Sequence, residues 1–93
     1  MTGSATPTTA FASGGISLTK RNGYVFAHMS FKVSTDVAVN ETIATLPSDF
    51  GTTKQIFADS TKGFIVFNTN GTVVAASAIP INNWVYGFAI WPA

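Results

Sequence analysis

The sequence contains no cysteine, one histidine (His28) and four carboxylate side chains. Without cysteine the chain can form neither a disulfide scaffold nor a thiolate-ligated zinc site. A single imidazole and four acids are also too few to indicate a dedicated metal centre. The sequence therefore predicts no metal site and no cofactor.

Charge is scarce as well. Charged residues make up 10% of the chain and the net charge is +1, whereas about 25% charged residues is usual. A nucleic-acid-binding protein needs a basic stripe, but only Lys20 and Arg21 lie together, so no nucleic-acid partner is expected. With 46% hydrophobic residues, solubility must come from Ser, Thr, Asn and Gly or from surface hidden in an oligomer. We favour the oligomer.

Long apolar runs are missing too. After Lys62 the chain carries no charge, but asparagine, glycine and proline interrupt this stretch repeatedly. No apolar run therefore approaches the ~20 residues that a membrane-spanning helix requires. We expect no membrane insertion.

What the sequence does contain is alternation. One alternate set of residues 24–33 is wholly apolar: Val25, Ala27, Met29, Phe31 and Val33. A period of two over ten residues predicts a β-strand with this set on a core. The other set includes Tyr24, Phe26 and His28, which would meet water in a lone domain. We expect another sheet, another chain or a ligand to cover that face.

Other short strands are expected at 16–19, 41–46, 55–59, 64–68, 72–76 and 84–91, and no helix. The Asn-Gly pairs at 22–23 and 70–71 are typical of hairpins. The sequence thus predicts an all-β domain over residues 16–93, a small antiparallel β-barrel or sandwich of about six to eight strands. Residues 1–15 are rich in Thr, Ser, Gly and Ala, which predicts a linker or N-terminal tail.

The final stretch, WVYGFAIW at residues 84–91, is apolar on both alternate faces. This pattern predicts burial on both sides. Trp84 follows Asn82 and Asn83, and a ring flanked by amides suits a sugar, whose C–H groups stack on the ring while amides meet its hydroxyls. Alternatively, Trp84 fills the core or a subunit contact.

Catalysis finds little support in the sequence. A Ser–His–Asp triad would need His28, and its strand setting gives no sign of one. The acids lie near strand ends or loops, where carboxylates are usually solvated. We predict that the protein is not an enzyme. His28 is either a half-buried hydrogen-bonded residue or a partner for a polar ligand, and Asp59 either supplies a polar contact or lies in a solvated turn.

Three stretches, ETIATLPSDF, GFIVFNTNGTVVAAS and NNWVYGFAIWPA, occur in an order that resembles a known family. It comprises the C-terminal head domains of receptor-binding and tail-tip proteins of tailed phages that infect lactococci and related Gram-positive bacteria. The resemblance implies a homotrimer of small β-barrel heads at the virion tail tip, outside the cell. It also implies that residues 1–15 join a neck or shaft and, through it, other baseplate proteins.

The same resemblance implies a non-enzymatic host-recognition module that binds cell-wall saccharide. The candidate saccharide-binding residues are His28, Trp84, Asn83, Asp59 and Asp36. A trimer would hide part of the aromatic surface, and its candidate interface residues are Tyr24, Phe26, Tyr86 and Phe88. The runner-up function is a structural trimerisation or decoration domain of a virion fibre without ligand binding. A polysaccharide-cleaving enzyme is a third possibility.

Overall fold

The structure, a computed structural model, describes residues 1–8 and 11–93. The regular structure of these residues consists of nine strands and one short 3-10 helix: β1 (Thr2–Ser4), β2 (Thr6–Pro7), β3 (Phe11–Arg21), β4 (Tyr24–Val33), β5 (Glu41–Thr45), η1 (Ser48–Phe50), β6 (Ile56–Ala58), β7 (Ile65–Phe67), β8 (Thr72–Ala75) and β9 (Trp84–Pro92). The predicted all-β class is confirmed. The strand count exceeds the expected six to eight because residues 2–7 also form strands.

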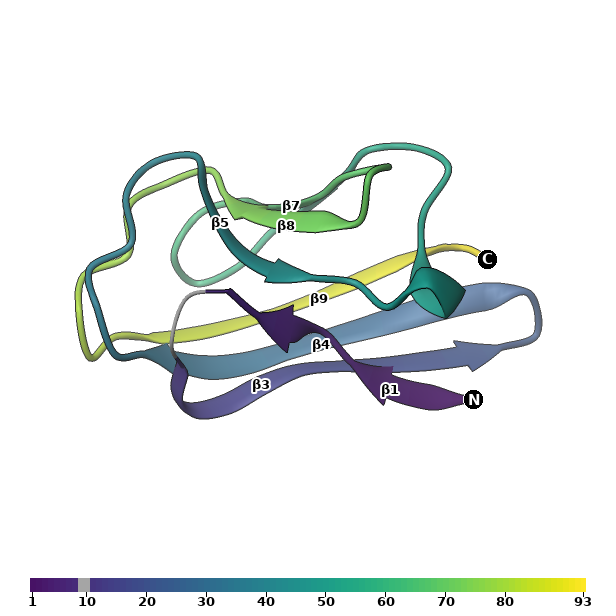
Figure 1. Cartoon of the computed structure of the whole chain (residues 1–93), viewed down its shortest axis with the longest axis horizontal. Helices are drawn as coiled ribbons and strands as arrows, with labels where there is room; N and C mark the ends of the chain where they lie inside the picture. The colour runs from purple at the N-terminus through teal and green to yellow at the C-terminus, as the bar shows by residue number, and fades with distance from the viewer. Residues whose placement is uncertain (9–10) are drawn as a thin grey trace.

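The described strands form two antiparallel sheets, with orders β1-β3-β4-β9 and β2-β5-β8-β7-β6. Figure 1 shows the long strands β3, β4 and β9 as one layer and the shorter strands of the second sheet as a layer above it. Both chain ends lie at the same end of the molecule. The fold is therefore the sandwich of the two predicted alternatives, and the barrel is not closed.

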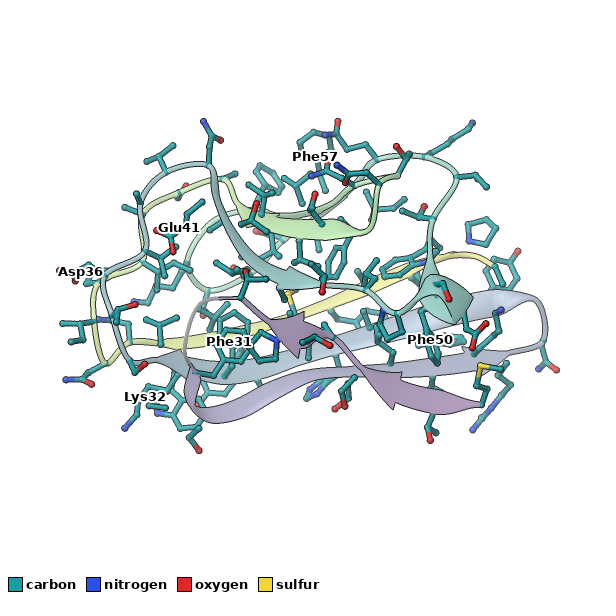
Figure 2. All side chains as sticks on the ribbon, viewed as in Figure 1. Phe31, Lys32, Asp36, Glu41, Phe50 and Phe57 are labelled. Atoms are coloured by element: carbon teal, nitrogen blue, oxygen red, sulfur yellow. The ribbon has the colours of Figure 1, made fainter. Side chains whose placement is uncertain are left out.

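The core lies between the two layers and follows the predicted alternation of β4. The whole apolar set of that strand is buried: Val25, Ala27, Met29, Phe31 and Val33. From the facing layer Phe67 packs against Trp91, with ring centroids 4.9 Å apart. Each large side chain fully buried here stabilises the fold by about 1.5–3 kcal/mol. Phe50 on η1 is also buried and closes one end of the core, as Figure 2 shows.

The first hairpin has the predicted chemistry. Asn22 and Gly23 both have positive φ, 53° and 80°, which is the conformation that a two-residue turn between right-twisted strands requires. In the β7–β8 hairpin only Gly71 has positive φ, and its N–H donates to the Asn68 carbonyl at 3.0 Å. The Asn-Gly signal therefore located both turns.

The N-terminal segment differs from its prediction as a tail. β1 pairs with β3 and β2 pairs with β5, so residues 2–7 pass from one sheet to the other around buried Ala5 (Figure 1). Composition missed these strands because edge strands can be built from polar residues whose backbones make the hydrogen bonds. Thr9 and Ala10, in the same predicted tail, lie outside the described residues. The junction to a neck domain stays a prediction.

Strand β9 is buried on one side only within this chain. Val85, Ala89 and Trp91 point into the core, whereas the bulkier alternate side chains point outward: Trp84, Tyr86, Phe88 and Ile90. Side-chain parity in a strand is fixed, so placing Trp91 inside places the whole other set outside. The expected burial on both sides is therefore not found within the chain.

Candidate functional site

The outer face of the first sheet is apolar along β4 and β9. Besides Ser30 and Lys32, the outward residues of these two strands form what we call the aromatic face: Tyr24, Phe26, His28, Trp84, Tyr86, Phe88 and Ile90. Strand register sets Phe26 opposite Ile90 and His28 opposite Phe88. The side chain of Phe88 is 55% exposed and that of Tyr86 is 48% exposed. Water is therefore in contact with rings that would normally lie inside a protein.

The size and charge of this face set it apart from ordinary surface. Six partly exposed large side chains amount to roughly 500 Å² of apolar surface, given 150–250 Å² for an aromatic residue. That lies in the upper part of the ~300–600 Å² typical of the largest patch on a monomer, which is often functional. Lys32 and Arg21 stand at its two ends, opposite Trp84 and Tyr24, and strands β3, β4 and β9 contain no carboxylate.

Two rings of the aromatic face are arranged in parallel. Trp84 and Tyr86 have ring centroids 5.7 Å apart and planes 8° apart. They project from the same side of β9 because they are two residues apart in a strand. Trp84 remains 37% exposed, so the pair presents aromatic surface without any rearrangement of the chain.

A short segment, residues 59–61, runs beside β9, and we call it the edge strap. The Thr61 N–H donates to the Tyr86 carbonyl at 3.0 Å, and the Tyr86 N–H donates to Thr61 Oγ1 at 3.1 Å. Ser60 forms a β-bridge with Gly87. A shallow hollow of about 270 Å³ lies here, lined by Asp59, Ser60, Thr61 and Tyr86.

The polar groups of the hollow differ in what they can still bind. The Ser60 hydroxyl donates to the Gly63 carbonyl and accepts from the Lys62 N–H, so it is already engaged. No hydrogen bond or ion pair engages the exposed Asp59 side chain within the described part of the chain. The hollow thus combines an available carboxylate with the flank of an aromatic residue.

The structure brings some of the predicted site residues together. Trp84 stacks on Tyr86, Tyr86 lines the hollow with Asp59, and His28 lies on the same sheet face beside Phe88. These three of the five predicted binding residues are all exposed: Trp84, Asp59 and His28. They belong to one surface that wraps from β4 over β9 to the edge strap.

Two other predicted site residues have partners in loops. Asp36 Oδ1 accepts a hydrogen bond from the Ile81 N–H at 2.8 Å, and Asn83 Nδ2 donates to the Pro80 and Ile81 carbonyls at 3.1 and 3.2 Å. Figure 2 shows Asp36 at one extreme end of the molecule. The Asp36 contact joins two loops, and the Asn83 contacts lie within one of them. A role for either residue in binding stays a prediction.

Sequence reasoning did not assign Thr61 to the site and assigned Tyr86 only to an interface. The alternation of residues 84–91 places Tyr86 on the same face as Trp84, so that signal was present. The contact between the edge strap and β9 joins residues 25 positions apart, and no pattern in the sequence marks it.

Within residues 1–8 and 11–93 no three His, Asp or Glu side chains gather where they could hold a metal ion. None of the described helices is long and apolar enough to cross a membrane.

Comparison with known proteins assigns no family to this chain. No family model matches the sequence, and no curated protein matches it significantly. The function proposed below therefore rests on the site and on the resemblance carried by the three sequence stretches.

Proposed function

We propose that this protein is a non-enzymatic recognition module that binds a cell-surface saccharide through the β9 side of its aromatic face. The observation that carries the proposal is the exposed, parallel pair of Trp84 and Tyr86. Sugar rings present C–H groups on one face and hydroxyls at the rim, so they bind where aromatic surface adjoins a few polar groups.

The biological setting follows from the sequence resemblance. It is that of a head domain at a phage tail tip, outside the cell, adsorbing to bacterial wall polysaccharide and connected to other baseplate proteins through the N-terminal part of the chain. A flat, exposed site on a sheet face suits a polymer of this kind, because a long glycan can lie across it without entering a deep pocket.

The proposal is tested by titrating wall polysaccharide from Gram-positive cells, lactococci included, against the protein by calorimetry. We expect saturable binding that weakens roughly tenfold in Trp84→Ala, since losing one ring contact and its buried area costs about 1–1.5 kcal/mol. Phe57→Ala is the matched control, because Phe57 is 60% exposed on the opposite sheet and projects from the far layer (Figure 2).

Two results would overturn this function. One is a wild-type protein that binds none of the polysaccharides. The other is a folded Trp84→Ala variant whose affinity equals that of Phe57→Ala, because the ring pair would then make no contribution that an unrelated exposed ring does not make.

A second candidate function is purely structural: a trimerisation or decoration domain of a virion fibre. The observation that favours it is the apolar strip toward the Tyr24 end of the aromatic face, where Phe26 and Phe88 have ring centroids 6.4 Å apart and Ile90 lies opposite Phe26. Such a domain would self-associate but would show no saccharide affinity. Both roles can coexist, since Trp84 lies at the opposite end of β9 from this strip.

A further inference from the structure

We infer that the hollow at the edge strap is a subsite for one uncharged, polyhydroxylated sugar ring, selected by the Asp59 carboxylate. The inference rests on the proposed function and adds to it the class of sugar and the residue that recognises it. The saccharide chain would place one ring in this hollow and continue over the Trp84–Tyr86 pair.

The inventory of hydrogen-bonding groups supports this ligand class. An ionised carboxylate only accepts hydrogen bonds, and its two oxygens can take two donors. Asp59 has both oxygens available among the described contacts. Thr61 Oγ1 accepts from the Tyr86 N–H and keeps its own hydrogen to donate. Adjacent hydroxyls of a sugar can donate to the two Asp59 oxygens and accept from the Thr61 hydroxyl. The Tyr86 side chain provides the apolar contact beside them.

The hollow is also held in place before any ligand arrives. The backbone bond from Thr61 to Tyr86, at 3.0 Å, and the Ser60–Gly87 bridge fix the edge strap to β9. The engaged hydroxyl of Ser60 shapes the turn that follows. Little ordering is then needed on binding, which preserves affinity for a small ligand.

The size of the hollow fits a single ring. Its volume of about 270 Å³ lies just below the ~300–1,000 Å³ range of pockets for drug-sized ligands. The hollow is shallow and open to solvent, so further units of a saccharide can continue over the neighbouring rings. Because Trp84 stacks on Tyr86, the aromatic surface continues directly from the hollow.

The charge of Asp59 gives the subsite its selectivity. Lys62 follows shortly after Asp59 in the chain, yet no salt bridge joins the two within the described residues. An acidic sugar that contacts Asp59 would therefore meet a carboxylate that is not held in an ion pair. Two like charges about 4 Å apart in water weaken binding on the order of fivefold, and more where water is displaced.

The test is an NMR titration in which the amide signals of Thr61 and Tyr86 report on the hollow. The neutral probe is methyl β-glucopyranoside, and the anionic probe is glucuronic acid in the form of its methyl β-glycoside, which differs from the neutral probe only at C6. For the wild type we expect saturable shifts of both amides with the neutral probe at millimolar concentration, and at least fivefold weaker binding of glucuronic acid. Asp59→Asn should weaken neutral-probe binding roughly tenfold and remove the discrimination against the acid.

Asp49→Asn is the control, because Asp49 is an exposed acid on η1, away from the hollow. The inference is overturned if Asp59→Asn binds the neutral probe as tightly as the wild type does, or if glucuronic acid binds equally well. A loss of polysaccharide binding in Trp84→Ala alongside unchanged Asp59→Asn affinity would remove the subsite and leave the proposed function standing. The opposite result is also possible: the neutral probe shifts Thr61 and Tyr86 saturably, while Trp84→Ala binds the polysaccharide as tightly as the wild type does. That result would keep the subsite and remove the proposed role of the ring pair.

Discussion

Gly87 occupies the point where the core, β9 and the edge strap meet. A Cβ at this position would lie 2.6 Å from Met29 Cε and 2.8 Å from the Asp59 carbonyl oxygen. The methionine tip can move, but the carbonyl belongs to the backbone of the strap. The absence of a side chain at residue 87 therefore allows the strap, and with it the hollow, to lie against the sheet.

We expect Gly87→Ala to lower the free energy of unfolding by about 1–3 kcal/mol, the usual range for overpacking a close contact. Gly15→Ala is the matched control: a Cβ there meets nothing within 4 Å, so this change should be neutral or slightly stabilising. Urea unfolding of the two variants decides the question. Equal stabilities would contradict the close approach of the strap.

The sequence alone does not show which tryptophan of residues 84–91 faces the core, and the structure does. Trp84 and Trp91 are both part of an apolar strand, and the pattern of residues 84–91 does not say which parity faces the core. Trp91 is fully buried and donates its indole N–H to the Gly51 carbonyl at 3.2 Å, whereas Trp84 is exposed. Which tryptophan is buried depends on the facing sheet, where Phe67 packs against Trp91, and not on the sequence of the strand itself.

At the scale of whole elements, prediction succeeded where one face of a strand is buried. The bounds of β4 were predicted to the residue because burial imposes strict alternation on it. The N-terminal strands β1 and β2 were not predicted, since neither buries a side chain and only Ala5, between them, reaches the core. Their pairing is made by backbone groups, such as the Ala5 N–H to the Ile16 carbonyl at 3.0 Å, which any sequence can supply.

Deleting residues 2–8 tests whether this segment is part of the domain. The deletion removes the backbone pairing of β1 with β3 and of β2 with β5, and it uncovers the part of the core that Ala5 now closes. We expect a net loss of stability of roughly 1–3 kcal/mol in urea unfolding, and increased aggregation because the edges of β3 and β5 become exposed.

The matched control keeps the backbone and changes only side chains. Thr2→Val and Thr6→Val alter exposed residues of the same two strands, so they should leave stability within about 0.5 kcal/mol of the wild type. If the deletion is as harmless as these substitutions, the segment behaves as the tail that its composition predicted.

At the scale of the whole molecule, the aromatic face bears on the oligomeric state of the protein. A chain with 10% charged residues has few charges with which to stay soluble while exposing this face. Yet roughly 500 Å² of apolar surface is less than the ~800 Å² that each partner contributes to a standard interface. A stable trimer would therefore also need to bury part of the Ser- and Thr-rich surface of β3, and otherwise association should be weak.

We expect sedimentation equilibrium to find a mass of three times the 9.8 kDa chain that falls toward the monomer at micromolar concentrations. Phe88→Asp should shift this equilibrium toward monomer at least tenfold, because it would bury an unpaired charge in the interface. Phe57→Asp places the same charge on the opposite sheet, where Phe57 is 60% exposed, and should leave the mass unchanged. A wild-type monomer at every concentration would rule out the trimer, and saccharide binding at Trp84 would then be a property of the single chain. Equal masses for the two variants would show that Phe88 does not lie in the interface.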